Sequence, residues 1–357
     1  YILHWKVTGD DGTVLAEGNK EVACEPHATV ELTLGAVQLP KTIREAYLDL
    51  GWTRKKSTPL VDTAWEIAYD QFVLPASGKV WNGKPSEAGK TTFEVDENTG
   101  ALKSLCLDGE ELLASPVTIS LFRPATDNDN RDRMGAKLWR KAGLHTLTQK
   151  VVSLKESKTS ATAQVNILNV TGKKVGDATL EYTLNHNGSL KVQTTFQPDT
   201  TWVKSIARLG LTFEMNDTYG NVTYLGRGEH ETYIDRNQSG KIGIYTTTPE
   251  KMFHYYVIPQ STGNRTDVRW VKLADTSGEG IFVESDRAFQ FSIIPFSDVL
   301  LEKARHINDL KRDGMLTVHL DAEQAGVGTA TCGPGVLPQY LVPLKKQHFE
   351  FTLYPVK

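Results

Sequence analysis

Apolar and polar residues alternate in short runs along most of the chain, which is the pattern of β-strands with one face on a core. The first region shows this pattern in ILHWKV, VLAEG, ATVELTL, EAYLDLGW and AWEIAYDQFVL, with turn residues between the runs. This spacing predicts a small immunoglobulin-like β-sandwich over residues 1–76. The next stretch, ASGKVWNGKPSEAGK, is rich in Gly, Pro, Ser and Lys and lacks periodicity. We therefore place a linker at residues 77–89.

A longer β region is predicted over residues 90–357. Its clearest element is a hairpin at Asn187-Gly188, because apolar residues alternate on both sides of this turn. Similar alternation occurs in TTFEVDENTGALKSLCLDG, KIGIYTTT, GIFVES, AFQFSIIPF, MLTVHLDA and HFEFTLYPV. One helix is expected between a Ser297 cap and a stop at Gly314. The fold class is therefore all-β, with a large antiparallel sandwich as the second domain.

Composition and charge exclude several classes of protein. The 357 residues carry a net charge of only -3, and Lys and Arg are scattered among acids, which argues against nucleic-acid binding. No apolar run approaches the roughly 20 residues of a membrane-spanning helix. The three cysteines are far apart, which argues against a zinc site or a disulfide framework. The chain begins inside a strand pattern without Met or a signal sequence, so we expect a piece of a longer protein, with the compartment left open.

The acidic segment FRPATDNDNRDRMG, residues 122–135, is the first candidate site. A calcium loop starting at Asp127 would need Gly in place of Asp132 and Glu in place of Leu138, so an EF-hand is excluded. Carboxylates and amides on a short loop could bind sugar hydroxyls. The alternative is a self-bonded turn, in which Asp and Asn side chains cap neighbouring N–H groups.

The segment LGRGEHETYIDR, residues 225–236, is the second candidate. His230 between Glu229 and Glu231 suggests the acid–base set of an aldose epimerase. In a strand, however, the two glutamates would share a face that the histidine does not. The alternative is a rim segment whose charges pair locally with Arg227 and Arg236.

Two further loops carry candidate residues. GVGTATCGPG, residues 326–335, has four glycines and Cys332, but the local sequence offers no histidine to activate a thiol. PQSTGNRTDVRW, residues 259–270, is interpreted as a salt-bridged turn with Arg265, Asp267 and Arg269.

The order of five motifs resembles the C-terminal domain of the large bacterial β-galactosidases of glycoside hydrolase family 2. The motifs are FRPATDNDN, YLGRGEHETYIDR, YVIPQSTGNRTDVRW, FQFSIIPFSDVLLEKARHINDL and GVGTATCGPGVLPQY. The region from ILHWKV through AWEIAYDQFVLP looks like the immunoglobulin-like domain that precedes it. The resemblance implies a supersandwich similar to the galactose mutarotase-like fold.

The resemblance also implies that the catalytic glutamates of a retaining β-galactosidase lie in a TIM barrel outside this chain. The fragment alone would then be inactive, although its parent hydrolyses terminal β-D-galactosides. The implied partners are the galactoside and the parent's barrel, and the parent is expected to be a homo-oligomer. No cofactor is expected in this chain, whereas the parent is expected to use Mg and Na in its other domains. The alternatives are a free-standing carbohydrate-binding protein and an aldose epimerase.

The resemblance assigns substrate-binding roles to the acidic turn and to the glycine-rich loop. The residues of the turn are Asp127, Asn128 and Asp129. The counterpart of a mobile loop over the sugar consists of Asn130, Arg131, Asp132, Arg133 and Met134. Cys332 stands where some members have a sugar-stacking tryptophan, so an aromatic contact of about 1 kcal/mol would be missing here. We hypothesise that a self-bonded Asp127-Asn128-Asp129 turn directs the following loop toward the sugar.

Overall fold

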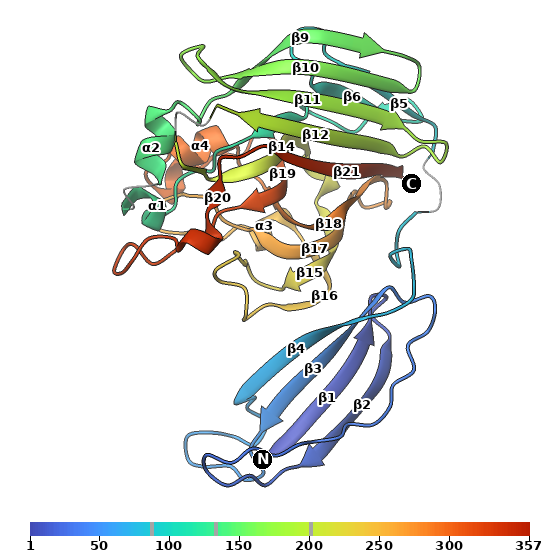
Figure 1. Ribbon diagram of the computed structural model, residues 1–357, viewed down its shortest axis with the longest axis vertical. Coiled ribbons are helices and arrows are strands. Elements are labelled where there is room, and N and C mark those ends of the chain that lie inside the picture. The colour runs from blue at the N-terminus through green and yellow to red at the C-terminus, as the bar shows by residue number, and fades with distance from the viewer. Residues whose placement is uncertain (86–88, 132–134, 200–202) are drawn as a thin grey trace. The chain divides into compact units, whose positions relative to one another are not determined.

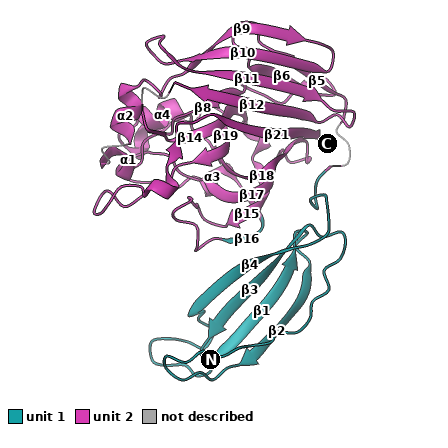
Figure 2. Cartoon of the chain, viewed as in Figure 1, with its two compact units in different colours: residues 1–84, 241–244 teal, residues 85–240, 245–357 magenta. Residues whose placement is uncertain are grey.

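The computed structural model describes residues 1–85, 89–131, 135–199 and 203–357. It separates into two compact units, unit 1 with residues 1–84 and 241–244, and unit 2 with residues 85–240 and 245–357 (Figure 2). Both consist mainly of antiparallel strands (Figure 1), which confirms the predicted all-β class. No helix in the described ranges is long and apolar enough to cross a membrane.

Unit 1 contains one antiparallel sheet in the order β2-β1-β3-β4. Its strands are β1 (Ile2–Gly9), β2 (Val14–Glu21), β3 (Glu45–Thr53) and β4 (Ala68–Pro75). Val7, Ile43 and Ala46 form its small core. Of the two sheets that a sandwich requires, the described residues of this unit form one. ATVELTL was predicted as a strand and forms none, because its alternating residues have no neighbouring strand to pair with.

The remaining strands follow residue 85 (Figure 1). They are β5 (Thr91–Val95), β6 (Leu102–Leu107), β7 (Glu110–Glu111), β8 (Thr118–Ser120), β9 (Thr148–Glu156), β10 (Ser160–Leu168), β11 (Lys174–Leu184), β12 (Leu190–Pro198), β13 (Ser205–Ile206), β14 (Arg208–Asn216), β15 (Asn221–Gly228), β16 (Lys241–Thr247), β17 (Arg265–Ala274), β18 (Gly280–Ile294), β19 (Met315–Gln324), β20 (Val342–Pro343) and β21 (Gln347–Val356). The main sheet has the order β16-β15-β17-β18-β21-β12-β11-β10-β9, and a branch runs from β18 through β19 and β14 to β8.

The predicted hairpin is confirmed in β11 and β12. Leu184 pairs with Leu190 across the turn, and Gly188 has a φ of 80°, which suits glycine. The side chain of Asn187 accepts a hydrogen bond from Ser189 N at 3.2 Å. The alternating residues that face inward join one continuous hydrophobic core, which also takes residues from β10, β14, β18 and β19.

Strand β18 connects the main sheet to the branch formed by β19, β14 and β8. GIFVES and AFQFSIIPF were predicted as separate strands, but both belong to this one 15-residue strand. Its first part pairs with β21, and its last part, Gln290–Ile294, pairs with β19. β19 in turn pairs with β14, and β14 pairs with β8.

Helices are short and few in the described residues. They are α1 (Asp127–Arg131), α2 (Ala136–Lys141), α3 (Pro249–Met252) and α4 (Asp298–Lys303), with 3-10 turns at Asp217–Tyr219, Ile307–Asp309 and Pro338–Tyr340. Ser297 caps α4 as predicted, accepting from Leu300 N at 3.3 Å. The prediction that this helix continues to Gly314 is wrong. The Asp309 carboxylate accepts from the backbone N–H groups of Arg305 and His306, which starts a separate turn.

Candidate functional site

Arg123 and Asp129 form a buried ion pair within FRPATDND. The guanidinium is fully buried, and its Nε and Nη2 donate to the two carboxylate oxygens of Asp129 at 2.9 and 2.8 Å. Burial alone would lower the pKa of Arg123, but the adjacent Asp129 carboxylate raises it. Buried charges persist when they are paired and hydrogen-bonded, so this pair anchors the segment.

The acidic turn is also closed by its own side chains. Asp129 Oδ2 accepts from Thr126 N at 3.0 Å, and Thr126 Oγ1 accepts from Asp129 N at 3.1 Å. This reciprocal arrangement is a capping box that begins helix α1. The interpretation of a self-bonded turn is therefore confirmed by these contacts. The Asp129 carboxylate is buried, and a direct contact between it and a sugar stays a prediction.

Asn128 joins the acidic turn to the glycine-rich loop. Its Nδ2 donates to Gly328 O at 2.8 Å, and its Oδ1 accepts from Thr331 N at 2.9 Å and from the Thr331 hydroxyl. Arg123 Nη2 adds a hydrogen bond to Gly326 O at 2.8 Å. Two segments that are 200 residues apart in the sequence are thereby held together.

Asp235 holds the other side of the glycine-rich loop. Its carboxylate accepts from Val327 N at 3.0 Å and from Gly328 N at 2.7 Å. Gly326 packs directly against this carboxylate, since a Cβ at that position would lie 2.4 Å from Asp235 Oδ2. Position 326 therefore needs glycine, because the Asp235 carboxylate, which binds the backbone of the loop, occupies the space that a side chain would fill.

Glu231 is the centre of a polar network. Its Oε1 accepts from the Tyr256 hydroxyl and from Arg236 Nη2, and its Oε2 accepts from the Thr262 hydroxyl at 2.9 Å and Gly263 N at 3.0 Å. Burial by itself raises the pKa of Glu231, but hydrogen bonds from Tyr256 and Arg236 lower it below its ordinary value. This carboxylate consequently stays ionised.

Tyr233 lies close to two guanidinium groups. Arg123 is 5.8 Å and Arg236 is 5.4 Å from the centre of its ring, both within cation–π range. Burial raises the pKa of Tyr233, so its hydroxyl stays protonated. The ring thus links the ion pair of the acidic turn to the Glu231 network.

These contacts enclose a cavity of about 240 Å³, which we call the loop cavity. Its lining comes from residues 126–128, 231–236, 256–261 and 327–331, so all four candidate segments meet here. The Asp127 side chain is exposed, and its backbone N–H donates to Gln260 Oε1 at 3.1 Å. The cavity presents a free carboxylate, amides and hydroxyls, which is a set of donors and acceptors suited to hydroxylated ligands.

Of the other predicted site residues, those that the structure describes, Asn130, Arg131 and Cys332, do not line the loop cavity. Asn130 and Arg131 are exposed, and Asn130 Oδ1 accepts from Arg140 Nη1 at 2.8 Å. Cys332 is an exposed free thiol whose backbone N–H donates to Thr329 O at 3.0 Å. Asp132, Arg133 and Met134 lie outside the described residues. The roles of these residues in substrate binding stay predictions. The described ranges contain no cluster of three His, Cys, Asp or Glu side chains able to hold a metal ion.

The suggested acid–base set is not assembled. His230 is exposed, and its Nε2 lies 2.7 Å from the Ser239 hydroxyl, whereas Glu231 belongs to the network described above. The expectation that Glu229 and Glu231 share a strand face is wrong, because β15 ends at Gly228. Local pairing of Glu231 with Arg236 is confirmed.

The predicted salt-bridged turn at residues 259–270 is also wrong. Arg265 begins strand β17, is buried, and donates to the Tyr224 hydroxyl at 2.9 Å and Glu229 O at 2.7 Å. Asp267 pairs with Arg227 instead.

Sequence reasoning missed several residues that line the loop cavity or hold its segments in place. Arg123 stands six positions before Asp129 in a quoted motif, and this pairing of opposite charges was the available signal. Thr126, three positions before Asp129, was the signal for the capping box. Tyr256 and Gln260 gave no local signal, because their contacts depend on packing between distant segments.

Comparison with family models gives two matches. Residues 87–353 match the model described as beta galactosidase small chain, and residues 1–75 match the model described as beta-galactosidase, domain 4.

Curated relatives are similar to the chain over most of its length. The beta-galactosidase of Priestia megaterium is 28% identical, over 85% of this chain and 31% of that protein. The beta-galactosidase of Actinobacillus pleuropneumoniae is 24% identical, over 96% and 35%, and that of Kluyveromyces lactis is 29% identical, over 84% and 31%. The chain therefore spans about a third of the length of the curated relatives it matches.

Solved structures align more loosely. A GalM/aldose epimerase homologue from C. elegans aligns with a TM-score of 0.39 and 13% identity, over 75% of this chain and 100% of that one. A galactose 1-epimerase from Lactobacillus acidophilus aligns with a TM-score of 0.37 and 8% identity, over 86% and 97%. At these scores the likeness carries no argument about the site.

Proposed function

The chain belongs to the family of beta-galactosidase small chains, and from this premise we propose that it is a non-catalytic portion of a β-galactosidase. In this proposal the parent is a retaining enzyme of glycoside hydrolase family 2 that hydrolyses terminal β-D-galactosides. The loop cavity of this chain forms part of the galactoside site, and the catalytic carboxylates lie in another part of the parent.

The geometry of the loop cavity is the observation that carries this proposal. Its volume of about 240 Å³ is below the roughly 300–1,000 Å³ of complete ligand pockets. Its groups are nevertheless of the kind that bind sugars, since Gln260, Tyr256 and the exposed Asp127 all line the cavity. A small polar cavity of this kind is suited to complete a site formed mainly by a neighbouring domain.

The charge state of the cavity supports a role in binding rather than in bond cleavage. A retaining glycosidase needs a carboxylic acid with a raised pKa beside a carboxylate nucleophile. Glu231 has a lowered pKa, and both its oxygens already accept hydrogen bonds. Glu231 therefore does not provide the protonated carboxylic acid that the reaction requires.

Further parts of the proposal concern the parent enzyme. In this proposal the parent uses Mg and Na in domains outside this chain and forms a homo-oligomer. The partners of this chain are the barrel and the galactoside, and they include neither nucleic acid nor a membrane. Cys332 in place of an aromatic residue removes a stacking surface, so the preferred galactoside would differ from that of members with a tryptophan there.

Kinetics of the parent enzyme with an Asp127→Ala substitution test the proposal. We expect KM for o-nitrophenyl β-D-galactoside to rise about fivefold with kcat nearly unchanged, because a binding contact is lost while the catalytic groups remain. Asp286→Ala is the matched control, since Asp286 is also exposed but does not line the cavity. Unchanged KM and kcat for the Asp127 variant would contradict the proposal.

The chain alone gives the second test. It should not hydrolyse o-nitrophenyl β-D-galactoside, because both catalytic carboxylates are assigned to other domains. Hydrolysis by the purified chain, abolished by substitution of a carboxylate in unit 2, would overturn the proposed division of roles.

A further inference from the structure

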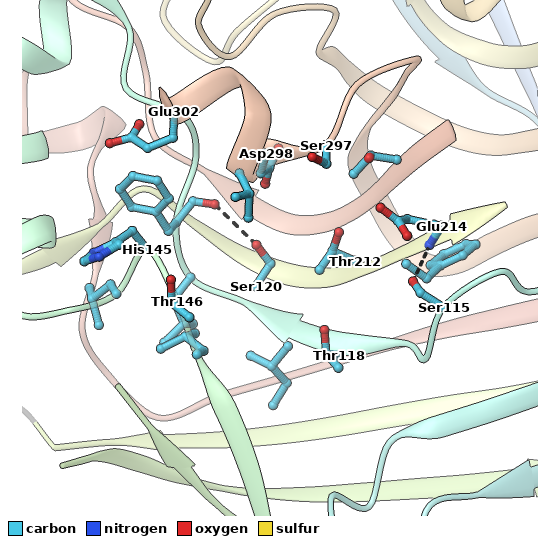
Figure 3. Close-up of a pocket in the computed structure, with 18 of the residues that line it drawn as sticks. Ser115, Thr118, Ser120, His145, Thr146, Thr212, Glu214, Ser297, Asp298 and Glu302 are labelled. Atoms are coloured by element: carbon cyan, nitrogen blue, oxygen red, sulfur yellow. Dashed lines mark hydrogen bonds between the residues drawn. The ribbon is translucent and has the colours of Figure 1, made fainter. Parts of the chain in front are cut away.

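Unit 2 contains a second cavity of about 430 Å³, which we call the sheet cavity. It is bordered by strands β8, β14 and β19, by the segment 144–147, and by residues 297–303 with helix α4 (Figure 3). It shares no lining residue with the loop cavity. Its volume lies within the roughly 300–1,000 Å³ of small-molecule sites.

The strand register places a row of polar side chains on one face of this branch of the sheet. Thr212 of β14 pairs with Thr118 of β8, and Glu214 pairs with Thr317 of β19. Residues two apart in a strand share a face, so Thr212 and Glu214 stand side by side. Figure 3 shows Thr118, Thr212 and Glu214 around the same hollow.

Several of these groups have unused hydrogen-bonding capacity. Thr118, Glu214 and Thr317 make no side-chain hydrogen bond to any residue in the described ranges, although Thr317 is only 6% exposed. Thr212 donates to Val318 O at 3.2 Å and keeps its oxygen free to accept. These groups are therefore available for hydrogen bonds to water or to a ligand in the cavity.

The charges around the cavity favour a neutral ligand. Asp298 is bound to His319 at 3.2 Å, and Glu302 is bound to Arg140 and to Ala125 N, so both carboxylates already have partners in the protein. Burial raises the pKa of the remaining carboxylate, Glu214, and so disfavours its charged form. Lys303 and His145 also line the cavity, so acidic and basic side chains are both present and neither sign of charge is favoured.

The lining of the cavity also includes apolar side chains, among them Phe122, Leu144 and Val299. A sugar or cyclic polyol combines hydroxyls on its edges with C–H groups on its faces, and this pattern matches a cavity lined by both polar and apolar side chains.

We propose that the sheet cavity binds a neutral polyol of monosaccharide size through the side chains of Thr118, Thr212, Glu214 and Thr317. This site is separate from the proposed galactoside site. It uses strand residues that are fixed by the backbone ladder, and its described lining residues all come from unit 2.

Ligand-detected NMR tests the proposal on the purified chain. Saturation-transfer titrations would use D-galactose and D-glucose as neutral probes, with spermidine and galactose 6-phosphate as charged probes. The double substitution Thr118→Val and Thr317→Val removes two hydroxyls but keeps the shape and β propensity of both side chains. We expect it to weaken hexose binding about 30-fold, because two hydrogen bonds are lost.

Thr179→Val is the matched control, since Thr179 is a half-buried strand threonine that does not line the cavity. Its hexose affinity should equal that of the original chain, and thermal unfolding of all variants would establish that they fold. Equal hexose binding by the double variant and the control would overturn the proposal. The absence of binding by either hexose, or binding of a charged probe alone, would also overturn it.

Discussion

The loop cavity and the sheet cavity of unit 2 are held in place by different interactions. The loop cavity is made of irregular segments that are fixed by side chains, above all the Arg123–Asp129 pair and the contacts of Glu231. The polar row of the sheet cavity stands on strands whose backbone ladder fixes Thr118 and Thr317 whatever their side chains are. We therefore expect single side-chain substitutions to disturb the loop cavity strongly and to leave the sheet cavity almost intact.

The largest effect is expected for Asp129→Asn. This change leaves the buried guanidinium of Arg123 without its carboxylate, and breaking a buried pair costs about 3–5 kcal/mol. The free energy of unfolding, measured by urea denaturation, would show the loss. Asp127→Asn in the same helix is the control, with an expected change within about 0.5 kcal/mol because Asp127 is exposed. Equal effects of the two substitutions would show that the buried pair does not anchor the loop cavity.

Much of the fold follows from the sequence because strand pairing repeats a local pattern. The β11–β12 hairpin and the cap of α4 were predicted correctly, since turn residues and a capping serine act within a few positions. The prediction of a strand at ATVELTL was wrong. A strand also needs a neighbouring strand, and the alternation of apolar and polar residues does not provide one. The single strand β18 was divided wrongly because it changes partners along its length, and this change depends on tertiary packing.

The two cavities differed in how far the sequence could predict them. The charged segments of the loop cavity stood out individually, but their meeting point depends on contacts such as Asn128 to Gly328, 200 residues apart. The sheet cavity was not predicted at all. Its threonines are ordinary strand residues, and only the register of β8, β14 and β19 brings them together.

Glu231→Gln should give the next largest effect and a pH dependence. Hydrogen bonds to a charged group contribute about 1.5–3 kcal/mol, so the variant should be less stable at neutral pH. The folded-state pKa of Glu231 is lowered from its ordinary 4.5, so its contribution is complete above that pH and is lost as the pH falls through the folded value. The difference in unfolding free energy between the two proteins should therefore shrink below pH 4.5. A constant difference at all pH values would exclude the ionised network.

Gly326→Ala probes how tightly the glycine-rich loop packs. The added Cβ would lie 2.4 Å from Asp235 Oδ2, and moving this carboxylate would weaken its bonds to Val327 N and Gly328 N. We expect a loss of about 1–3 kcal/mol in thermal unfolding. Gly220→Ala is the control, since its nearest atoms would be 3.2 Å away. Equal thermal stability of the two alanine variants would show that Asp235 does not constrain the glycine-rich loop.

The smallest effect is expected for Thr118→Val in the sheet cavity. Its hydroxyl has no hydrogen-bond partner in the described part of the chain, so its removal sacrifices no internal contact. Valine also suits a strand position, and the change in unfolding free energy should stay within about 0.5 kcal/mol. Thermal unfolding of this variant beside Asp129→Asn measures the contrast directly. A loss comparable to that of Asp129→Asn would mean that the sheet cavity, like the loop cavity, depends on side-chain contacts for its shape.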